Sequence, residues 1–222
     1  MRTILLTGFE PYGSTPINPA EQVARRLDGV EVEGARVVAR IVPNVFFACI
    51  ERVAAAIREL RPEAVVMLGE YPGRAVVTVE RLAQNLNDGT RYGLVDNAGV
   101  RLQDQLTAPD GPAAYYSTLP IRAMVAAVRA AGVPADISDT AGTFCCNHLM
   151  YGTLHHLAAE QSPIRAGWIH LPALPEVAAR VEHLGLPSMS AETSAAGVRA
   201  ALVAIQRHPT DVAETVPSRL QI

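Results

Sequence analysis

The fold is decided by a stretch that runs from Ala141 to Tyr151 and has the sequence AGTFCCNHLMY. The residues just before it, Ala135–Ser138, have the pattern of the end of a strand, and the AGT at its start favours a tight turn. From about Cys146 the apolar residues recur at the spacing of a helix with one buried face. The stretch therefore predicts a thiol where a strand meets the first turn of a helix.

That position suits a reactive cysteine. The first turn of a helix has unpaired N–H groups and the positive end of the helix dipole, and both favour an anion. We therefore expect this turn to lower the pKa of the Cys146 thiol and to hold an oxyanion. Cys146 is the predicted nucleophile, whereas Cys145 and Cys49 are expected to be packing residues.

Strands and helices alternate on both sides of this stretch. Strands are expected at residues 2–7, 36–42, 64–68, 76–79 and 166–170, and helices at about 19–27, 45–60, 120–131, 175–184 and 191–207. This rhythm favours an α/β fold, with a mostly parallel twisted sheet and helices on its faces. The strand before Cys146 is expected at the centre of the sheet. A polar stretch at 86–111 predicts a long functional loop. No linker or repeat divides the chain, so residues 1–222 are expected to form a single domain.

The composition excludes several classes of function. All 19 basic residues are Arg, so the chain has no lysine for a Schiff base, a Ser–Lys pair or a phosphate-binding P-loop. The net charge of −3 and the lack of a basic cluster argue against nucleic acid as a partner. Three cysteines make no disulfide framework and fit a reducing compartment. The first apolar run, of about five residues, is too short for a signal peptide or membrane span, so we expect a cytoplasmic protein without membrane contact.

A cysteine nucleophile needs a base, and the sequence has six histidines. His148 follows Cys146 by two residues, so it points away from the thiol around the helix. His170 is the only histidine expected at the carboxyl end of a strand, which is where sites lie in parallel sheets. On the residues alone, His170 is equally well interpreted as the base or as a satisfied core histidine.

Other polar groups give weaker signals. Glu80 ends a β-branched run and stands next to Arg81, which by itself favours a structural ion pair over a catalytic acid. His148, His155 and His156 are near one another in the chain, but no zinc-ligand spacing supports a metal site.

The loop after the first strand carries two aromatic residues, Phe9 and Tyr12. They either plug the end of the sheet or form a flat apolar pocket wall. Asn18 followed by Pro19 predicts a helix N-cap with proline at the first helical position.

Four motifs together resemble the pyroglutamyl peptidase I (pyrrolidone-carboxylate peptidase) family of cysteine peptidases. They are TGFEPYG at 7–13 with the Asn18–Pro19 pair, the run 69–85 that ends in TVERLAQN, TAGTFCCNHLMYG at 140–152, and GWIHLP at 167–172. By this resemblance Cys146 matches the nucleophile, His170 the base and Glu80 the acid that orients the base. The resemblance thus replaces the structural interpretation of Glu80.

The resemblance also implies a three-layer α/β/α sandwich, no cofactor and, as in many bacterial members, a homotetramer. It implies peptides with an N-terminal pyroglutamate as substrates. Phe9 and Tyr12 match the aromatics that flank the pyroglutamyl ring, and Asn18 matches a pocket neighbour by position. Arg91 matches the family's arginine near the thiol.

The chain departs from the family pattern in three places. Glu70 stands where the family usually has Gln, and an ionised carboxylate only accepts hydrogen bonds, so substrate preference or pH dependence is expected to shift. The segment Asp88–Asn97, which contains Arg91, is longer than in the family. Tyr12 replaces a Phe. Two alternatives stay open: a related cysteine amidase with a different acyl group, and a non-catalytic α/β ligand-binding protein.

Overall fold

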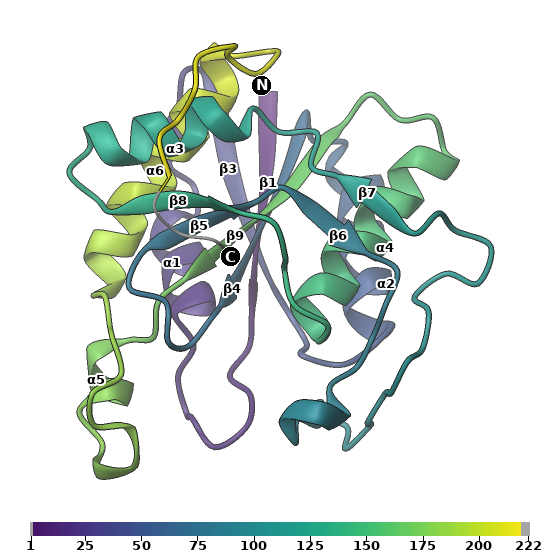
Figure 1. The fold of residues 1–222 in the computed structure, drawn as a ribbon. Helices are drawn as coiled ribbons and strands as arrows, with labels where there is room; N and C mark the ends of the chain where they lie inside the picture. Colours follow the sequence, from purple (N-terminus) through teal and green to yellow (C-terminus); the bar gives the residue numbers. More distant parts are fainter. Residues whose placement is uncertain (1, 219–222) are drawn as a thin grey trace.

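The computed structural model describes residues 2–218, and a seven-stranded mixed sheet forms its centre (Figure 1). The strand order is β2-β3-β1-β4-β9-β5-β8. The strands are β1 (Arg2–Phe9), β2 (Glu31–Val32), β3 (Ala35–Val42), β4 (Ala64–Glu70), β5 (Val77–Glu80), β8 (Ala135–Ser138) and β9 (Arg165–Leu171). Two further short strands, β6 (Leu82–Gln84) and β7 (Ala114–Tyr116), pair with each other in a separate sheet.

The sheet is mostly parallel, as predicted, but not throughout. Strands β3, β1, β4 and β9 are parallel neighbours, whereas β5 runs antiparallel to β9, and β8 follows the direction of β5. The expectation that the strand before Cys146 is central is wrong, because β8 is the edge strand. Helix α3 (Ile121–Ala130) packs over β8, so three of the four residues of this edge strand are buried.

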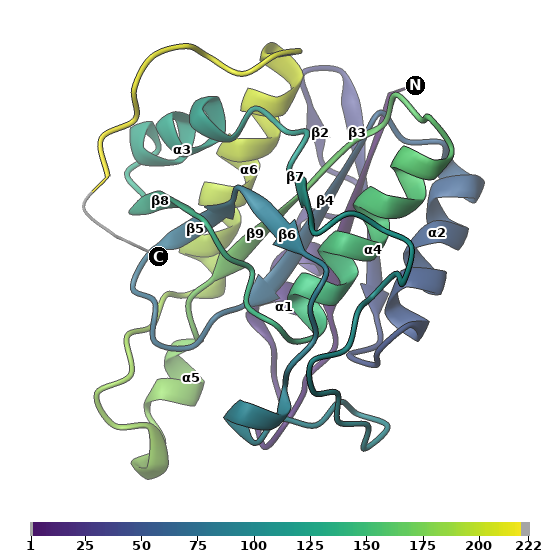
Figure 2. The ribbon, with the colours of Figure 1, turned by 45° about the vertical axis from the view of Figure 1, so that its right-hand side comes forward.

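Helices cover both faces of the sheet (Figures 1 and 2). Helices α1, α3 and α6 lie on one face, and α2 and α4 lie on the other. Besides α3, these helices are α1 (Pro19–Leu27), α6 (Ala191–Arg207), α2 (Ala48–Leu60) and α4 (Cys145–Ala159). A short helix, α5 (Pro175–Ala178), and 3₁₀ turns at Thr90–Tyr92 and Val181–His183 complete the helical segments of residues 2–218. The helix expected at 175–184 is therefore only one turn long. Within residues 2–218, no helix is long and apolar enough to cross a membrane.

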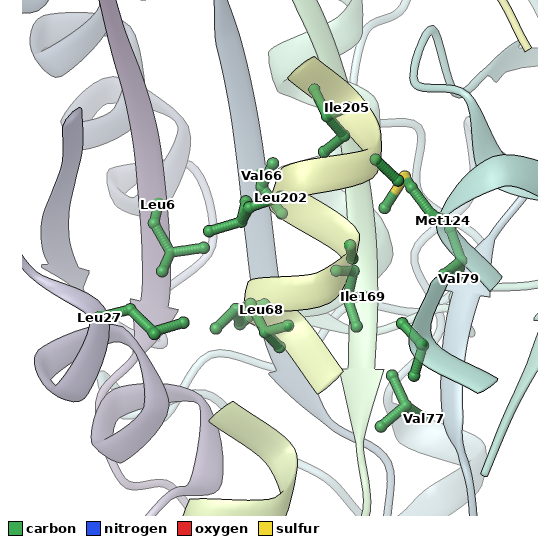
Figure 3. Packing of buried hydrophobic residues seen from close by; sticks show 14 of the residues in the cluster. Leu6, Leu27, Val66, Leu68, Val77, Val79, Met124, Ile169, Leu202 and Ile205 are labelled. Atoms are coloured by element: carbon green, nitrogen blue, oxygen red, sulfur yellow. The ribbon is translucent and has the colours of Figure 1, made fainter. Parts of the chain in front are cut away.

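Side chains of each strand alternate between two cores. Leu6, Leu68 and Ile169 pack with Leu202 of α6 on the α1/α3/α6 face (Figure 3). Their neighbours Leu5, Met67 and Trp168 pack on the α2/α4 face. Each fully buried side chain of this size stabilises the fold by about 1.5–3 kcal/mol. The same alternation assigns Gly69, Glu80 and His170 to the α2/α4 face, where α4 begins with the two cysteines.

Candidate active site

A cavity of about 250 Å³ lies where β4 and β9 end beside the first turn of α4. Its lining includes Tyr12, Asn44, Glu70, Tyr71, Tyr92, Phe144, Cys146 and His170. The cavity thus lies at the carboxyl ends of two parallel strands, which is the usual place for a site in an α/β sheet.

Cys146 is the second residue of α4, as the sequence predicted for the strand–turn–helix stretch. Its sulfur lies directly on the backbone of β4: a β-carbon at Gly69 would stand 2.9 Å from Cys146 Sγ and 2.6 Å from Cζ2 of Trp168. Real β-carbons do not approach other atoms this closely. Glycine at position 69 therefore makes room for the thiol at the floor of the site.

Glu80 and His170 form a buried hydrogen-bonded pair. Nδ1 of His170 lies 2.7 Å from Oε1 of Glu80, and both side chains are almost fully buried. The antiparallel register of β5 and β9 pairs Thr78 with His170. Glu80 lies two residues further along β5 on the same face, so its carboxylate reaches the imidazole. A carboxylate on Nδ1 fixes the tautomer with an unprotonated Nε2. This Nε2 has no hydrogen-bond partner in residues 2–218, and its ring lines the same cavity as Cys146.

Arg74, which had no predicted role, binds the carboxylate of this pair. Its Nη1 donates to Oε1 of Glu80 at 2.7 Å and to Oγ1 of Thr78 at 2.6 Å, and its guanidinium lies 3.6 Å from the ring centroid of Tyr71. Only 8% of Arg74 is exposed. The sequence neighbour of Glu80, Arg81, instead forms a surface ion pair with Asp139. The interpretation of Glu80 and Arg81 as an ion pair, made from the residues alone, is therefore wrong: neighbouring residues of an extended chain face opposite sides, and the cation that binds Glu80 is Arg74.

The expectation of a lowered thiol pKa is wrong. Burial raises the pKa of the Cys146 thiol, and the carboxylate of Glu80 raises it further, while Arg74 lowers it only in part. Burial also lowers the pKa of His170, although Glu80 opposes this shift. The effect of burial on the pKa of the Cys146 thiol thus outweighs the opposite effect of the helix N-terminus. The resting site holds a neutral thiol and a neutral imidazole.

The aromatic wall differs from the expected one. Phe9 is 1% exposed, packs behind the site against Trp168 at 5.7 Å between ring centroids, and does not line the cavity. Tyr12 does line it, and the ring opposite is Phe144, at 6.4 Å between centroids. Phe144, between the predicted turn at 141–143 and the cysteines, had no predicted role in the pocket.

Two other predicted pocket residues lie outside the cavity wall. Asn18 caps α1: its Oδ1 accepts from the N–H of Ala20 at 2.9 Å, and its Nδ2 donates to the carbonyl of Glu10 at 3.1 Å. This confirms the predicted N-cap. Both polar atoms of the Asn18 side chain are thus hydrogen-bonded to the backbone. Arg91 is exposed in the Thr90–Tyr92 turn, with its guanidinium 4.6 Å from the ring centroid of Tyr92, which itself lines the cavity.

His148 turns away from Cys146, as expected, and joins three segments. Its Nε2 accepts from the N–H of Phe47 at 2.9 Å, and its Nδ1 lies 3.1 Å from Oδ1 of Asn87 and 3.0 Å from Oγ1 of Thr107. It therefore ties α4 to the start of α2 and to the long excursion. Within residues 2–218, no group of three or more His, Cys, Asp or Glu is arranged to hold a metal ion.

Comparisons with known proteins agree with this architecture. A family model described as pyroglutamyl peptidase matches residues 2–208. The chain is 60% identical to the pyrrolidone-carboxylate peptidase of Mycobacterium tuberculosis over 222 residues, which is all of both chains. It is 49% identical to that of Cupriavidus pinatubonensis over 215 residues, 96% of this chain and 97% of the relative.

Solved structures agree as well. The crystal structure of Bacillus amyloliquefaciens pyroglutamyl peptidase I superposes with a TM-score of 0.90 at 34% identity, covering 96% of this chain and 100% of that one. The pyrrolidone carboxyl peptidase from Thermococcus litoralis gives 0.90 at 34% identity, covering 97% and 100%. Fold and relatives define a peptidase, a hydrolase that acts on peptide bonds. Within that class, the chain belongs to the pyroglutamyl peptidase family.

Proposed function

We propose that the enzyme removes an N-terminal pyroglutamyl residue from peptides, with Cys146 as nucleophile, His170 as base and Glu80 as the orienting acid. One observation carries the proposal: Glu80 holds Nδ1 of His170 at 2.7 Å, Nε2 of His170 has no hydrogen-bond partner among residues 2–218, and His170 and Cys146 line the same cavity. This is the arrangement that activates a thiol in cysteine hydrolases.

The neutral resting pair sets the order of events. Nε2 of His170 takes the thiol proton as Sγ of Cys146 attacks the pyroglutamyl carbonyl carbon. The oxyanion forms at the first turn of α4, where the N–H of Cys146 donates to it. The imidazolium then protonates the leaving amine, and water hydrolyses the thioester with His170 again as base. Arg91 is exposed and stacked on Tyr92, so we assign the oxyanion to the helix N–H groups alone.

Selectivity follows from the cavity wall. A flat uncharged lactam fits against the rings of Tyr12 and Phe144, which line the cavity together. A substrate with a free N-terminal ammonium would have to bury an unpaired charge there, which is costly.

The test is release of a fluorescent amine from a pyroglutamyl amide under reducing conditions. Wild type and Cys145→Ala are compared with Cys146→Ala, since Cys145 is fully buried in the core and serves as the matched control. We expect turnover by the first two and none by the third. Turnover by Cys146→Ala would overturn the proposal.

A second acyl specificity is suggested by one observation, the carboxyl of Glu70 in the cavity. Prolyl and glutaminyl amides, assayed beside the pyroglutamyl amide, separate the two enzymes. A protein that hydrolyses none of them and whose Cys146 resists alkylation would instead fit the non-catalytic ligand-binding alternative.

The chain is further proposed to act in the cytoplasm as one catalytic domain within a homo-oligomer, a tetramer by family resemblance. Support comes from Val181 and Leu184, which are 83% and 72% exposed on the segment that projects from the sheet beside α5 (Figures 1 and 2). Light scattering after size exclusion should give a multiple of the chain mass for wild type and a smaller species for a Val181→Asp/Leu184→Asp variant. A monomeric wild type would contradict this.

A further inference from the structure

Two residues of the cavity wall have a buried polar atom with no role in the proposed reaction at Cys146. Oε1 of Glu70 and Oδ1 of Asn44 are both covered by protein and have no hydrogen-bond partner in the part of the chain that the structure describes. Both residues line the cavity with Cys146, and they are 6% and 2% exposed. A buried polar atom without a partner costs about 1–3 kcal/mol. Such atoms beside a nucleophile indicate groups that await a ligand.

The ligand chemistry is constrained by what these two groups can do. The rest of the wall is mostly aromatic and aliphatic, so a bound ring would be apolar apart from the groups that meet Glu70 and Asn44. A lactam ring has one N–H donor and one carbonyl acceptor. Asn44 Oδ1 can only accept, whereas Glu70 can donate a hydrogen bond only as a neutral carboxylic acid.

We propose that Glu70 binds the lactam as a neutral acid that donates to the ring carbonyl, while Oδ1 of Asn44 accepts from the ring N–H. This inference rests on the proposed function and deepens it, because it names the two groups that recognise the pyroglutamyl ring. Both are specificity-determining residues rather than catalytic ones, since neither is placed at the reacting bond.

The surroundings of Glu70 favour the neutral acid near neutral pH. Burial raises the pKa of Glu70 to about 7, and the hydroxyl of Tyr12, from the segment after β1, lowers it only in part. The other titratable groups that line the cavity are the phenols of Tyr71 and Tyr92, Cys146 of α4, neutral at rest, and His170 of β9, whose pKa is lowered. Arg74, in the segment after β4, is already bonded to Glu80. None of these groups supplies a free positive charge that would hold Glu70 ionised.

The pH dependence follows from this state. Below pH 7 the protonated carboxyl of Glu70 donates a hydrogen bond to the lactam carbonyl. Above pH 7 the carboxyl loses this proton, and the resulting anion repels the carbonyl oxygen. Affinity for the lactam should therefore fall about tenfold for each pH unit above the pKa of Glu70. Glu70→Gln keeps a donor at every pH and removes the titration.

The first test compares kcat/KM of wild type and Glu70→Gln on a pyroglutamyl amide between pH 5.5 and 9. Ionisation of Cys146 and His170 affects both enzymes, so the ratio of the two values isolates Glu70. We expect a constant ratio below pH 7 and a fall of wild type relative to the variant above it. Glu51→Gln, an exposed carboxyl on α2, should keep the wild-type profile. A ratio that does not change with pH would overturn the inference.

The second test needs no turnover and examines Asn44. Binding of 2-pyrrolidone and of N-methyl-2-pyrrolidone to the Cys146→Ala protein is measured by calorimetry at pH 6, with and without Asn44→Ala. We expect the N-methyl compound to bind several-fold more weakly to Cys146→Ala itself, and this discrimination to vanish in the Asn44→Ala background. Equal discrimination with and without Asn44 would overturn its role. Lactam binding without any turnover by wild type would instead defeat the proposed function and leave this inference standing.

Discussion

At the scale of single residues, Arg74 governs the state of the Glu80–His170 pair. Its guanidinium shares Oε1 of Glu80 with the imidazole, and its charge adds to burial, the larger cause, in lowering the pKa of His170. Loss of this charge leaves the Glu80 carboxylate buried without a cation. Removing one partner of a buried ion pair lowers the free energy of unfolding by about 3–5 kcal/mol. Arg74 is therefore a positioning residue that acts through Glu80.

We predict that Arg74→Met lowers kcat and raises the pKa of His170, so that the acid limb of the pH–rate profile moves to higher pH. Arg74→Lys keeps the charge and should move the limb less. The profiles are measured by amine release from pH 5 to 9. If kcat fell in Arg74→Met with the acid limb unmoved, Arg74 would have only a structural role.

Gly69 is the residue that admits the thiol. An added methyl would stand 2.9 Å from Sγ of Cys146 and 2.6 Å from the Trp168 ring, so Gly69→Ala must displace one of them. A displacement of the order of 1 Å in a catalytic group costs about a hundredfold in rate, and we expect a fall in kcat of that order with an unchanged circular dichroism spectrum. Wild-type kcat in Gly69→Ala would contradict the position of the thiol.

Sequence alone reached only part of this site. The strand–turn–helix pattern placed Cys146 correctly, and the strand end left His170 equally divided between two roles. Glu80 came only from the family resemblance, because its partners His170 and Arg74 are brought to it by the antiparallel register and by a turn. Phe144 and Asn44 were missed because nothing local distinguishes a residue that faces a cavity from one in a loop.

At the scale of elements, periodicity predicted the long helices and strands and failed where direction or length decides. An apolar run of four residues does not reveal which way a strand runs, so the antiparallel β5 was not foreseen. Strands β2, β6 and β7 have two or three residues each, too few for a pattern. The helix from 175 ends after one turn, and a second, 3₁₀ turn follows at Val181–His183.

The start of α2 is held by α4 through His148. Phe47 has a positive φ of 62°, and the N–H of Ala48 donates to the carbonyl of Phe46 at 2.7 Å, which makes a tight three-residue turn of a strained kind. The N–H of Phe47 is satisfied by Nε2 of His148, which must stay unprotonated to accept it. Burial lowers the pKa of His148 to about 4.

Acid should therefore loosen this element. Between pH 6.5 and 4 the unfolded chain binds a proton at His148 that the folded chain does not, so stability falls as pH falls, by about 3 kcal/mol in all. His148→Gln should lack this dependence. Urea unfolding at several pH values measures it, and a slope equal to that of wild type would contradict the assignment.

At the scale of the whole molecule, Glu70 acts on stability with the opposite sign. Its pKa rises from 4.5 to about 7 on folding, so between these values the folded chain holds a proton that the unfolded chain has lost, and stability falls as pH rises. The contribution is about 3 kcal/mol and is fully lost above pH 7. The effects of Glu70 and His148 therefore offset each other over nearly the same range.

Wild type should accordingly show a flatter pH–stability profile than either variant. Glu70→Gln should gain about 3 kcal/mol relative to wild type between pH 4.5 and 7, with a constant difference above that. Urea unfolding of the three proteins at matched pH values provides the comparison. A difference between Glu70→Gln and wild type that stays constant from pH 4 to 8 would show that Glu70 does not titrate as described.

Trapping the thioester intermediate shows which residue carries the acyl group. The Cys145→Ala protein is mixed with a pyroglutamyl amide, quenched in acid within the first turnovers, digested and analysed by mass spectrometry. We expect one pyroglutamoyl group on the peptide that contains Cys146, and none in a Cys145→Ala/Cys146→Ala protein. Rapid turnover by Cys145→Ala with the acyl group found on another residue would contradict it.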